Sequence, residues 1–140
     1  MKILEQLESR RAWTADEAMI LDQVRRISAE TIAPNADRYD RENAYPKLSM
    51  DAVNGLGLNG LFIPEAYGGA PSRFAVYLAA VKTISEACAS TGIIYATNCH
   101  GMKPLVDFGT EEQKKRLLPC IAGGGIGALA ITEANAGSDA

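Results

Sequence analysis

The sequence is poor in the residue types that mark metal-binding and disulfide-stabilised proteins. Its 140 residues include a single histidine and three cysteines, Cys88, Cys99 and Cys120. An odd, sparse set of cysteines without a C-x-x-C pair fits a reducing compartment better than a disulfide scaffold. One histidine also leaves no cluster with the spacing of metal ligands. We therefore expect neither a disulfide framework nor a metal site.

Long apolar runs and an excess of basic residues are also missing. No apolar run approaches the roughly 18 residues that a membrane span needs. The N-terminus, MKILEQLE, has acids where a signal peptide has its apolar region. The net charge is -3 and the isoelectric point is near 5.2, which argues against a broad nucleic-acid interface. These absences predict a cytoplasmic protein with no nucleic-acid partner and no membrane span.

The composition that remains is that of an ordinary globular domain. Hydrophobic residues make up 47% of the chain and charged residues 22%. A chain of 140 residues corresponds to about one domain. Alanine is the most frequent residue and runs of β-branched residues are short, so helix is the expected secondary structure.

Capping boxes predict where two of the helices begin. In a capping box each side chain of a pair bonds the backbone N–H of the other residue, and two pairs fit the pattern: Thr14 with Glu17, and Thr110 with Gln113. Behind the first box, apolar residues recur near the helical period as far as Ile32. Pro34 then predicts a kink or break near Ala33, because the residue before a proline avoids the helical region.

An apolar stripe predicts a strong helix over about residues 72–89. Its members recur at spacings of three and four, which places them on one helix face: Phe74, Tyr77, Leu78, Val81, Ile84 and Cys88. The tripeptide Ser90-Thr91-Gly92 is expected to separate this helix from a second apolar helix over residues 93–102. Two apolar helices in succession indicate that one of them lies deep in a bundle.

Residues 126–132 form the one convincing strand, and residues 133–140 a turn. A single strand cannot satisfy its own backbone hydrogen bonds, and the sequence offers no second strand. The strand either pairs with another chain or opens a β domain that this chain does not contain, and we favour the second interpretation. We expect it to be extended and unpaired within its own domain.

Taken together, these patterns predict an all-α fold. We expect a helical bundle of about five or six helices that ends in one strand, which would open a missing β domain. The expected divisions are an N-terminal arm over residues 1–13, a helical domain over 14–124, and the strand with its turn over 125–140.

Three short motifs suggest chemistry but have simpler explanations. Residues 55–60 match G-x-G-x-x-G, yet the dinucleotide fingerprint needs a strand before it and a helix after it, and Pro64 follows here. Residues 123–127 could cradle a phosphate, but these glycines leave a helix rather than enter one, which favours a linker. Cys99 and His100 are neighbours on a helix and do not face each other, so we assign no catalytic residue.

The turn over residues 132–139 is better suited to binding. The hydroxyls of Thr132 and Ser138 flank Gly137 at the exit of an apolar strand. Such a turn can offer several backbone N–H groups and two hydroxyls to one polar ligand. Many surface turns share this composition, so the signal is moderate on its own.

Several segments, in the right order, resemble the acyl-CoA dehydrogenase family. The similarity covers nearly everything from Thr14 to the end of the chain. It is carried by the strings Ile32-Ala-Pro34, Asp40-Arg-Glu-Asn-Ala-Tyr-Pro46, Leu61-Phe-Ile-Pro-Glu-Ala-Tyr-Gly-Gly69, Phe108-Gly-Thr-Glu-Glu-Gln-Lys114 and Ala130-Ile-Thr-Glu-Ala-Asn-Ala-Gly-Ser-Asp139. The last string is similar to the family's flavin-contacting turn, T-E-P-x-A-G-S-D.

The resemblance implies a flavoenzyme with an N-terminal helical domain, a middle β domain and a C-terminal helical bundle. Family members bind FAD in a cleft between domains and between subunits. They oxidise an acyl-CoA thioester to the trans-2-enoyl-CoA by α-proton abstraction and β-hydride transfer to the flavin. The base is a glutamate of the C-terminal domain in most members, so no residue of this chain takes that role. The implied partners are an acyl-CoA substrate, an electron acceptor such as an electron-transfer flavoprotein, and further copies in a homo-oligomer.

Six residues correspond to the family's flavin segment: Leu129, Ala130, Ile131, Thr132, Gly137 and Ser138. The resemblance places Leu129 and Ile131 against the flavin ring and the Thr132 hydroxyl at its polar edge. Gly137 would allow a close backbone approach, and Ser138 would be shared between the cofactor and the pantetheine part of the substrate. Ala134 stands where the family usually has proline and Asn135 where it commonly has glycine, which loosens the turn.

The resemblance also implies an acyl pocket and leaves two other functions open. Tyr95, Asn98 and Cys99 match the region that walls the acyl tail, and they would make a narrow or somewhat polar pocket. One alternative function is an acyl-CoA oxidase or related flavin monooxygenase of the same fold. The other is a non-enzymatic helical module that docks onto partner subunits. The 140-residue chain alone is expected to be inactive.

Overall fold

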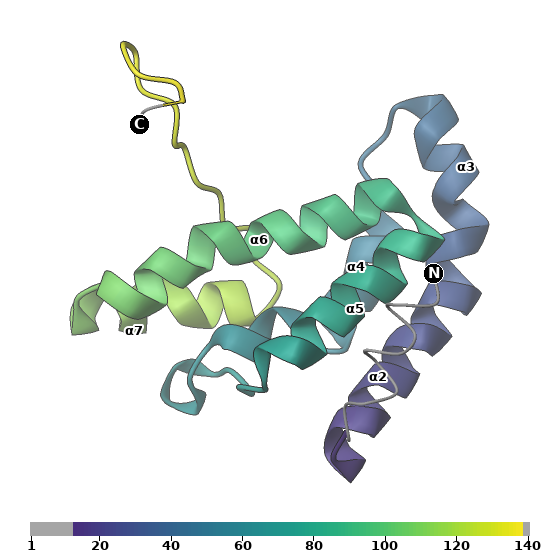
Figure 1. Cartoon of the computed structure of the whole chain (residues 1–140), viewed down its shortest axis with the longest axis horizontal. Helices are drawn as coiled ribbons and strands as arrows, with labels where there is room; N and C mark the ends of the chain where they lie inside the picture. The colour runs from purple at the N-terminus through teal and green to yellow at the C-terminus, as the bar shows by residue number, and fades with distance from the viewer. Residues whose placement is uncertain (1–12, 139–140) are drawn as a thin grey trace.

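The computed structural model describes residues 13–138, and within this range every regular element is a helix or a helical turn. The elements follow one another as drawn in Figure 1: α2 (Ala15–Ile27), the π-helical turn η1 (Ser28–Ile32), α3 (Ala33–Glu42), α4 (Lys47–Gly55), the 3-10 turns η2 (Leu58–Phe62) and η3 (Glu65–Tyr67), α5 (Phe74–Ala87), α6 (Ala89–Phe108) and α7 (Glu111–Ala122). The predicted all-α helical bundle is confirmed.

The long helix α6 lies at the centre of the packing. It forms a helical hairpin with α5, and α4, α7 and η2 also pack against it. The α2 helix packs on the far helix of this hairpin, α5. One hydrophobic core joins these elements, with buried side chains that include Val24, Val53, Ile84, Tyr95, Met102 and Leu118.

Both predicted capping boxes are formed. The Thr14 hydroxyl accepts a hydrogen bond from the Glu17 N–H at 3.3 Å, and the Glu17 carboxylate accepts one from the Thr14 N–H at 2.9 Å. At α7 the Thr110 hydroxyl accepts from the Gln113 N–H at 3.3 Å, and the Gln113 side-chain oxygen accepts from the Thr110 N–H at 2.8 Å. These bonds satisfy backbone donors that a helix start leaves without partners.

The carboxylate of Glu17 also ties α2 to the start of α5. It forms a two-pronged ion pair with the Arg73 guanidinium, with both contacts at 2.5 Å. The guanidinium carbon lies 5.7 Å from the centroid of the Trp13 ring, in cation–π range. The Arg73 guanidinium, together with the Thr14 N–H, lowers the pKa of Glu17 to about 2. One side chain therefore caps a helix and joins two segments 56 residues apart.

The expected kink or break near Ala33 is replaced by a widened helical turn. Ala33 keeps helical dihedral angles, φ -59 and ψ -44, and its N–H bonds the carbonyl of Ser28, five residues earlier. The π turn directly precedes Pro34, which lacks a backbone N–H and clashes with the preceding turn of a regular helix. The chain therefore stays helical from α2 into α3 (Figure 1).

The boundary between α5 and α6 lies earlier than predicted. The break is at Cys88, whose backbone is extended (φ -160, ψ 111), and Ser90 to Gly92 lie inside α6. A methyl group at Gly92 would lie 2.0 Å from the Ser85 hydroxyl oxygen. Gly92 thus allows the close approach of α5 and α6, rather than separating two helices.

The face of α5 that is buried also differs from the predicted stripe. Val76, Tyr77, Ala80 and Ile84 are buried, whereas Phe74 is 58% exposed and Leu78 is 45% exposed. The close crossing at Gly92 decides which face of α5 meets α6. Helical spacing alone shows which residues share a face, but not which neighbour covers that face.

The predicted strand over residues 126–132 is not formed. Within the described residues no strand partner is present: the Gly127 N–H bonds the Asn98 side chain at 2.5 Å, and the turn that follows is closed by the Glu133 N–H on the Ala136 carbonyl at 2.9 Å. A ladder needs a second strand, so the prediction that this segment is unpaired within its own domain is confirmed. Figure 1 shows the segment, in yellow, leaving the helical body.

The Glu17–Arg73 ion pair predicts a specific pH dependence of stability. Folding lowers the pKa of Glu17 from 4.5 to about 2. The ionised carboxylate therefore stabilises the folded state above pH 4.5, and this stabilisation is lost as the pH falls towards 2. Glu17→Gln should lower the unfolding temperature at pH 7. Between pH 4.5 and 2, the unfolding temperature of this variant should fall less steeply with pH than that of the wild type. The measurement is thermal unfolding by circular dichroism across this range. Asp16→Asn, a matched change at an exposed residue, should keep the wild-type slope, and equal slopes for all three proteins would contradict the assignment.

Candidate functional site

The six residues predicted to contact a flavin lie together on the segment that follows α7. Leu129 is 50% exposed and Ile131 63% exposed, and the other four, Ala130, Thr132, Gly137 and Ser138, are exposed as well. They lie in two short runs, residues 129–132 and 137–138, on the segment drawn in yellow that leaves the helical body in Figure 1. They form one open wall, whose apolar side chains precede two hydroxyl groups.

The hydroxyls of this wall are available for binding. Neither Thr132 nor Ser138 makes a hydrogen bond to another described residue. A methyl group built at Gly137 would meet no heavy atom within 4 Å, so the backbone there is open to a ligand. The stretch can therefore offer apolar contact, hydroxyl groups and bare backbone to one ligand.

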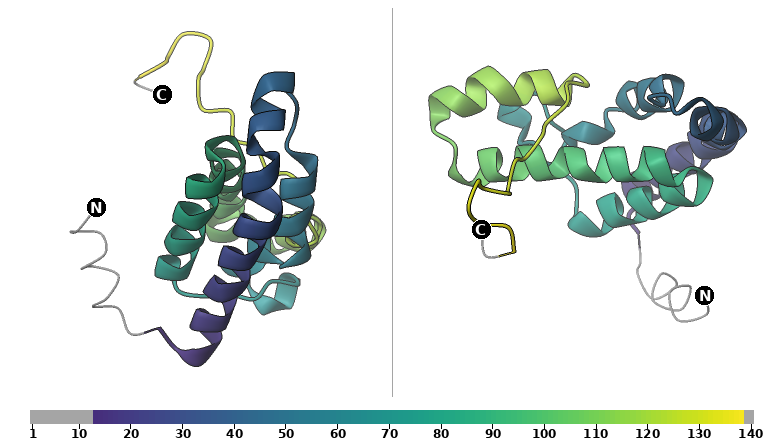
Figure 2. Two further views of the ribbon diagram at one scale, coloured as in Figure 1. Left: turned by 90° about the vertical axis from the view of Figure 1, so that its right-hand side faces the viewer. Right: turned by 90° about the horizontal axis from the view of Figure 1, so that it is seen from above.

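A glycine-rich linker, residues 123–127, carries this wall across α6. The right-hand view of Figure 2 shows the yellow segment crossing α6 after leaving α7. At the crossing, a methyl group on Gly101 would lie 2.4 Å from the Ala128 nitrogen and 2.8 Å from the Gly127 α-carbon. Helix and linker thus touch backbone to backbone, and Gly101 makes this contact possible.

Three asparagine side chains hold the linker at the crossing. Asn98 of α6 accepts a hydrogen bond from the Gly127 N–H at 2.5 Å, and its amide group donates to the Gly125 carbonyl at 3.4 Å. The same amide group donates to the side-chain oxygen of Asn59 at 3.0 Å. Asn59 in turn donates to Asn54 at 2.8 Å, and Asn54 donates to the Gly124 carbonyl at 3.4 Å.

The residues expected to wall an acyl tail are buried in the core instead. Tyr95 is 1% exposed and its hydroxyl donates to the Leu58 carbonyl at 3.2 Å, while Cys99 is 8% exposed. Burial raises the pKa of both groups. Asn98 is 4% exposed, and its amide is occupied by the linker and by Asn59. None of the three lines the pockets beside Trp13, Met19 or Tyr39.

Sequence reasoning missed the roles of Asn54 and Asn59. Both lie in the stretch that reads as a helix stop and turn, where asparagine is common for local reasons. The helix stop itself is confirmed, because Gly57 adopts a left-handed conformation with φ 67. The contact that gives Asn59 its role reaches across 39 residues, and no local pattern contains it.

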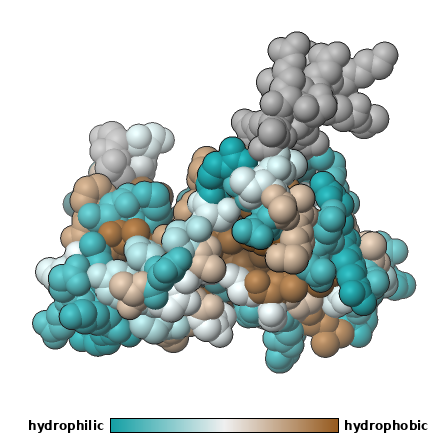
Figure 3. All heavy atoms as spheres, turned by 90° about the horizontal axis from the view of Figure 1, so that it is seen from below, coloured by the Kyte–Doolittle hydropathy of each residue, from teal (hydrophilic) through white to brown (hydrophobic). Residues whose placement is uncertain are grey.

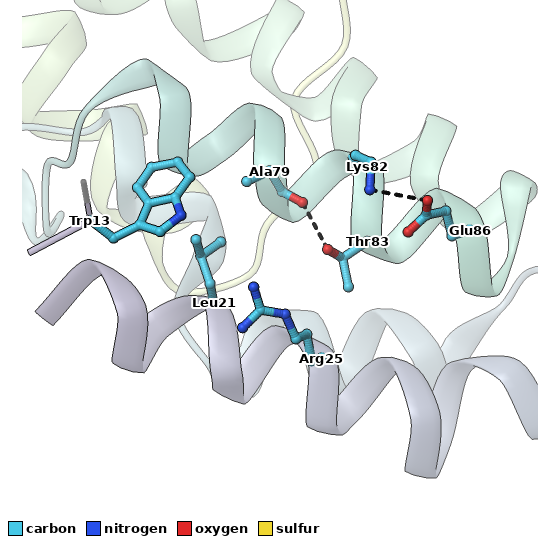
Figure 4. Close-up of a pocket in the computed structure, with 7 residues that line it drawn as sticks. All are labelled: Trp13, Leu21, Arg25, Ala79, Lys82, Thr83 and Glu86. Atoms are coloured by element: carbon cyan, nitrogen blue, oxygen red, sulfur yellow. Dashed lines mark hydrogen bonds and ion pairs between the residues drawn. The ribbon is translucent and has the colours of Figure 1, made fainter. Parts of the chain in front are cut away.

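A separate pocket lies between α2 and α5. Figure 4 shows this pocket of about 260 Å³, with Trp13 at one end. Its polar groups are paired: Lys82 with Glu86 at 3.1 Å, the Thr83 hydroxyl with the Ala79 carbonyl at 3.0 Å, and Arg25 with Asp22 at 2.5 Å. None of the residues predicted to bind cofactor or substrate lines it.

The surface also carries exposed apolar area. Figure 3 shows hydrophobic residues gathered in the middle of the lower face, between hydrophilic ones. A shallow apolar pocket of about 180 Å³ is lined by Met19, Ile20, Gln23, Leu56 and Leu58. Among residues 13–138 no group of three or more histidine, cysteine, aspartate or glutamate side chains could hold a metal ion. No helix in this range is long and apolar enough to cross a bilayer.

Comparison with known sequences identifies the fold and its exit segment. The sequence model of the acyl-CoA dehydrogenase N-terminal domain matches residues 14–125. This chain belongs to the acyl-CoA dehydrogenase family. The matched range ends in the glycine linker, two residues before Gly127, which meets Gly101 of α6.

Individual relatives of this acyl-CoA dehydrogenase family member agree in sequence and in shape. The chain is 39% identical over 129 residues to a probable acyl-CoA dehydrogenase of Bacillus subtilis, YngJ, with 91% of this chain and 34% of that protein covered. A chain in a structure of the electron transferring flavoprotein of Acidaminococcus fermentans matches with a TM-score of 0.84 and 33% identity, covering 91% of this chain and 34% of that one. An acyl-CoA dehydrogenase complexed with FAD from Bacillus anthracis matches with a TM-score of 0.81 and 28% identity, covering 91% and 22%. The chain thus spans about a third of the length of the Bacillus subtilis relative.

The backbone contact at Gly101 predicts a local effect of adding one methyl group. In Gly101→Ala the new methyl would overlap the Ala128 nitrogen, so the linker must move while α6 keeps its helical structure. Amide NMR spectra should show the largest shifts at Gly125 to Ala128. Gly55→Ala is the control, because a methyl group there meets nothing within 4 Å, and it should leave the linker signals in place. Shifts confined to α6 in Gly101→Ala would contradict the crossing.

Proposed function

We propose that this chain supplies the N-terminal helical wall and the flavin-contacting turn of an FAD-dependent acyl-CoA dehydrogenase. The reaction is oxidation of an acyl-CoA thioester to the trans-2-enoyl-CoA, by abstraction of the α proton and transfer of the β hydride to FAD. One observation carries the proposal. Leu129, Ile131, Thr132 and Ser138 are exposed and have no hydrogen-bond partner among residues 13–138, on a segment that the helical body anchors at its base.

The exposed residues fit a flat group with a polar edge. Leu129 and Ile131 would cover the apolar part of the flavin ring, which removes their exposed side chains from water. The Thr132 hydroxyl would donate a hydrogen bond to the polar edge of the ring, and Gly137 lets the backbone come close. FAD, when bound, accepts the hydride. The similarity to the acyl-CoA dehydrogenase complexed with FAD from Bacillus anthracis supports this cofactor.

Substrate binding and proton abstraction divide between this chain and the rest of the enzyme. Ser138 would bind the pantetheine part of the acyl-CoA as well as the cofactor. We assign the catalytic base to a part of the enzyme outside this chain. The proposed domain limits are a helical domain over residues 14–124 and the opening of the β domain over 125–140.

The partners are part of the same proposal. The electron acceptor would be a protein such as an electron-transfer flavoprotein. The similarity to a chain in the structure of the electron transferring flavoprotein of Acidaminococcus fermentans supports this acceptor. The intact enzyme would form a homo-oligomer, and its cytoplasmic location stays a prediction from the composition.

The 140-residue chain should bind FAD weakly or not at all. It provides one wall of the proposed site, and association costs several kcal/mol of lost freedom that few contacts can offset. After incubation with excess FAD and gel filtration, the protein peak should carry no stoichiometric flavin absorbance. A yellow peak with one FAD per chain would show that the site is complete without a second wall.

Substitutions at the two hydroxyls test the flavin-contacting turn. The test protein is a chimera in which residues 14–138 replace the matching segment of the Bacillus subtilis relative. Thr132→Val keeps the side-chain shape but removes one hydrogen bond, which should weaken FAD binding by about 1–3 kcal/mol and shift the flavin absorbance spectrum. Ser138→Ala should weaken binding of FAD or acyl-CoA.

Titration with FAD and with an acyl-CoA, followed by flavin reduction, measures both effects. Both residues are exposed and outside the core, so the unfolding temperature of the 140-residue chain should not change with either substitution. If both variants keep the affinity and reduction rate of the unmodified chimera, the assignment of these two residues is wrong.

A further inference from the structure

The three asparagines and the linker form one closed circuit of hydrogen bonds. The circuit runs from the Gly127 N–H to Asn98, from Asn98 to Asn59, from Asn59 to Asn54, and from Asn54 to the Gly124 carbonyl. Each side chain accepts with its oxygen and donates with its nitrogen. Since a backbone N–H only donates and a carbonyl only accepts, the two ends fix the orientation of every amide between them.

Burying these amide side chains in the core carries a free-energy cost. Asn59 is 2% exposed and Asn98 4% exposed, and a buried amide without partners is unfavourable by more than a typical hydrogen bond contributes. The bonds connect three elements of the bundle to a segment that forms no strand. These elements are α4 through Asn54, η2 through Asn59 and α6 through Asn98. The linker is thus held at three of its backbone groups.

The circuit controls the register of the segment that follows. In the proposed enzyme this segment opens a β domain, and residues two apart in an extended strand face the same side, which would put Gly127, Leu129 and Ile131 on one side. A slip of one residue at the anchor would exchange Leu129 and Ile131 for alanines 128 and 130 on that side. The backbone contact at Gly101 fixes where the segment crosses α6, and the bond from Gly127 to Asn98 fixes which residue stands at the crossing.

We propose that Asn54, Asn59 and Asn98 are positioning residues, which set the register and direction in which the flavin-contacting segment leaves the helical domain. This inference rests on the proposed function for its consequence, because the segment is the proposed flavin wall. The anchoring itself is a property of the 140-residue chain and can be tested there without a cofactor.

The first experiment measures hydrogen exchange of single amides in the 140-residue chain. The Gly127 N–H should exchange at least about tenfold more slowly in the wild type than in Asn98→Leu, because its acceptor is lost. Tyr77→Phe is the matched control. It removes a bond from a largely buried hydroxyl to the Ala96 carbonyl of α6, at 3.1 Å, without touching the linker. Unchanged Gly127 exchange in Asn98→Leu, or equal loss in Tyr77→Phe, would overturn the anchoring.

Two further variants guard against a general loss of structure. The side chain of Asn59 is hydrogen-bonded to Asn54 and Asn98 and to no linker residue among those described. Asn59→Leu therefore acts on the linker only through these two asparagines. Asn54→Ala removes the outermost bond at a half-buried residue. Both should speed Gly127 or Gly125 exchange while the core amides of α6 stay protected. Exchange that rises equally in the linker and throughout α6 would mean that the asparagines serve stability alone, which contradicts the proposal.

The second experiment measures whether the anchoring of the linker changes the affinity for FAD. In the Bacillus subtilis chimera, Asn98→Leu and Asn59→Leu should raise the Kd for FAD about tenfold or more, and Tyr77→Phe should change it by less than about twofold, at a temperature where all are folded. An unchanged Kd in a chimera that holds FAD would overturn the positioning role. A chimera that holds no FAD even without substitutions contradicts the proposed function, while slow Gly127 exchange in the chain would still support the anchoring.

Discussion

The backbone contact between α6 and its neighbours is the constraint on which the rest of this structure depends. Near its start, Gly92 allows α5 to pack within contact distance, and one turn after Asn98, Gly101 allows the linker to cross. Between them Tyr95 and Asn98 point into the core and reach the turn that begins at Leu58. A side chain at either glycine would move a neighbour, so the position of α6 fixes both the bundle and the direction in which the chain leaves it.

Local features of this fold could be predicted from the sequence, and long-range ones could not. The capping boxes at Thr14 and Thr110 depend on residues three apart, and both are formed. The burial of α5 depends on where α6 crosses it, so Tyr77 and Ile84 of the predicted stripe are buried while Phe74 and Leu78 are exposed. A kink or break was expected near Ala33 because the residue before a proline avoids the helical region. The structure instead forms a π-helical turn over Ser28–Ile32, which keeps the chain helical.

The candidate site shows the same division. The sequence predicted that residues 126–132 have no strand partner within their own domain, and it marked the hydroxyls of the turn that follows, although the segment forms no strand here. The anchor of that segment could not be predicted, because Asn59 and Asn98 meet only after η2 and α6 have packed. Asn98 was instead expected at an acyl pocket through the family resemblance. In the structure its amide faces the linker, where it connects the fold of the bundle to the placement of the proposed flavin wall.

The chain covers about a third of its Bacillus subtilis relative. We propose that the helical domain of this chain positions one wall of a flavin site. A crystal structure of the chimera with bound FAD measures this most directly. The account predicts that the Gly127 nitrogen stays hydrogen-bonded to Asn98 and that the Thr132 hydroxyl lies within hydrogen-bond distance of the flavin ring. A flavin bound away from residues 129–138, or a segment that leaves α6 at another residue, would contradict it.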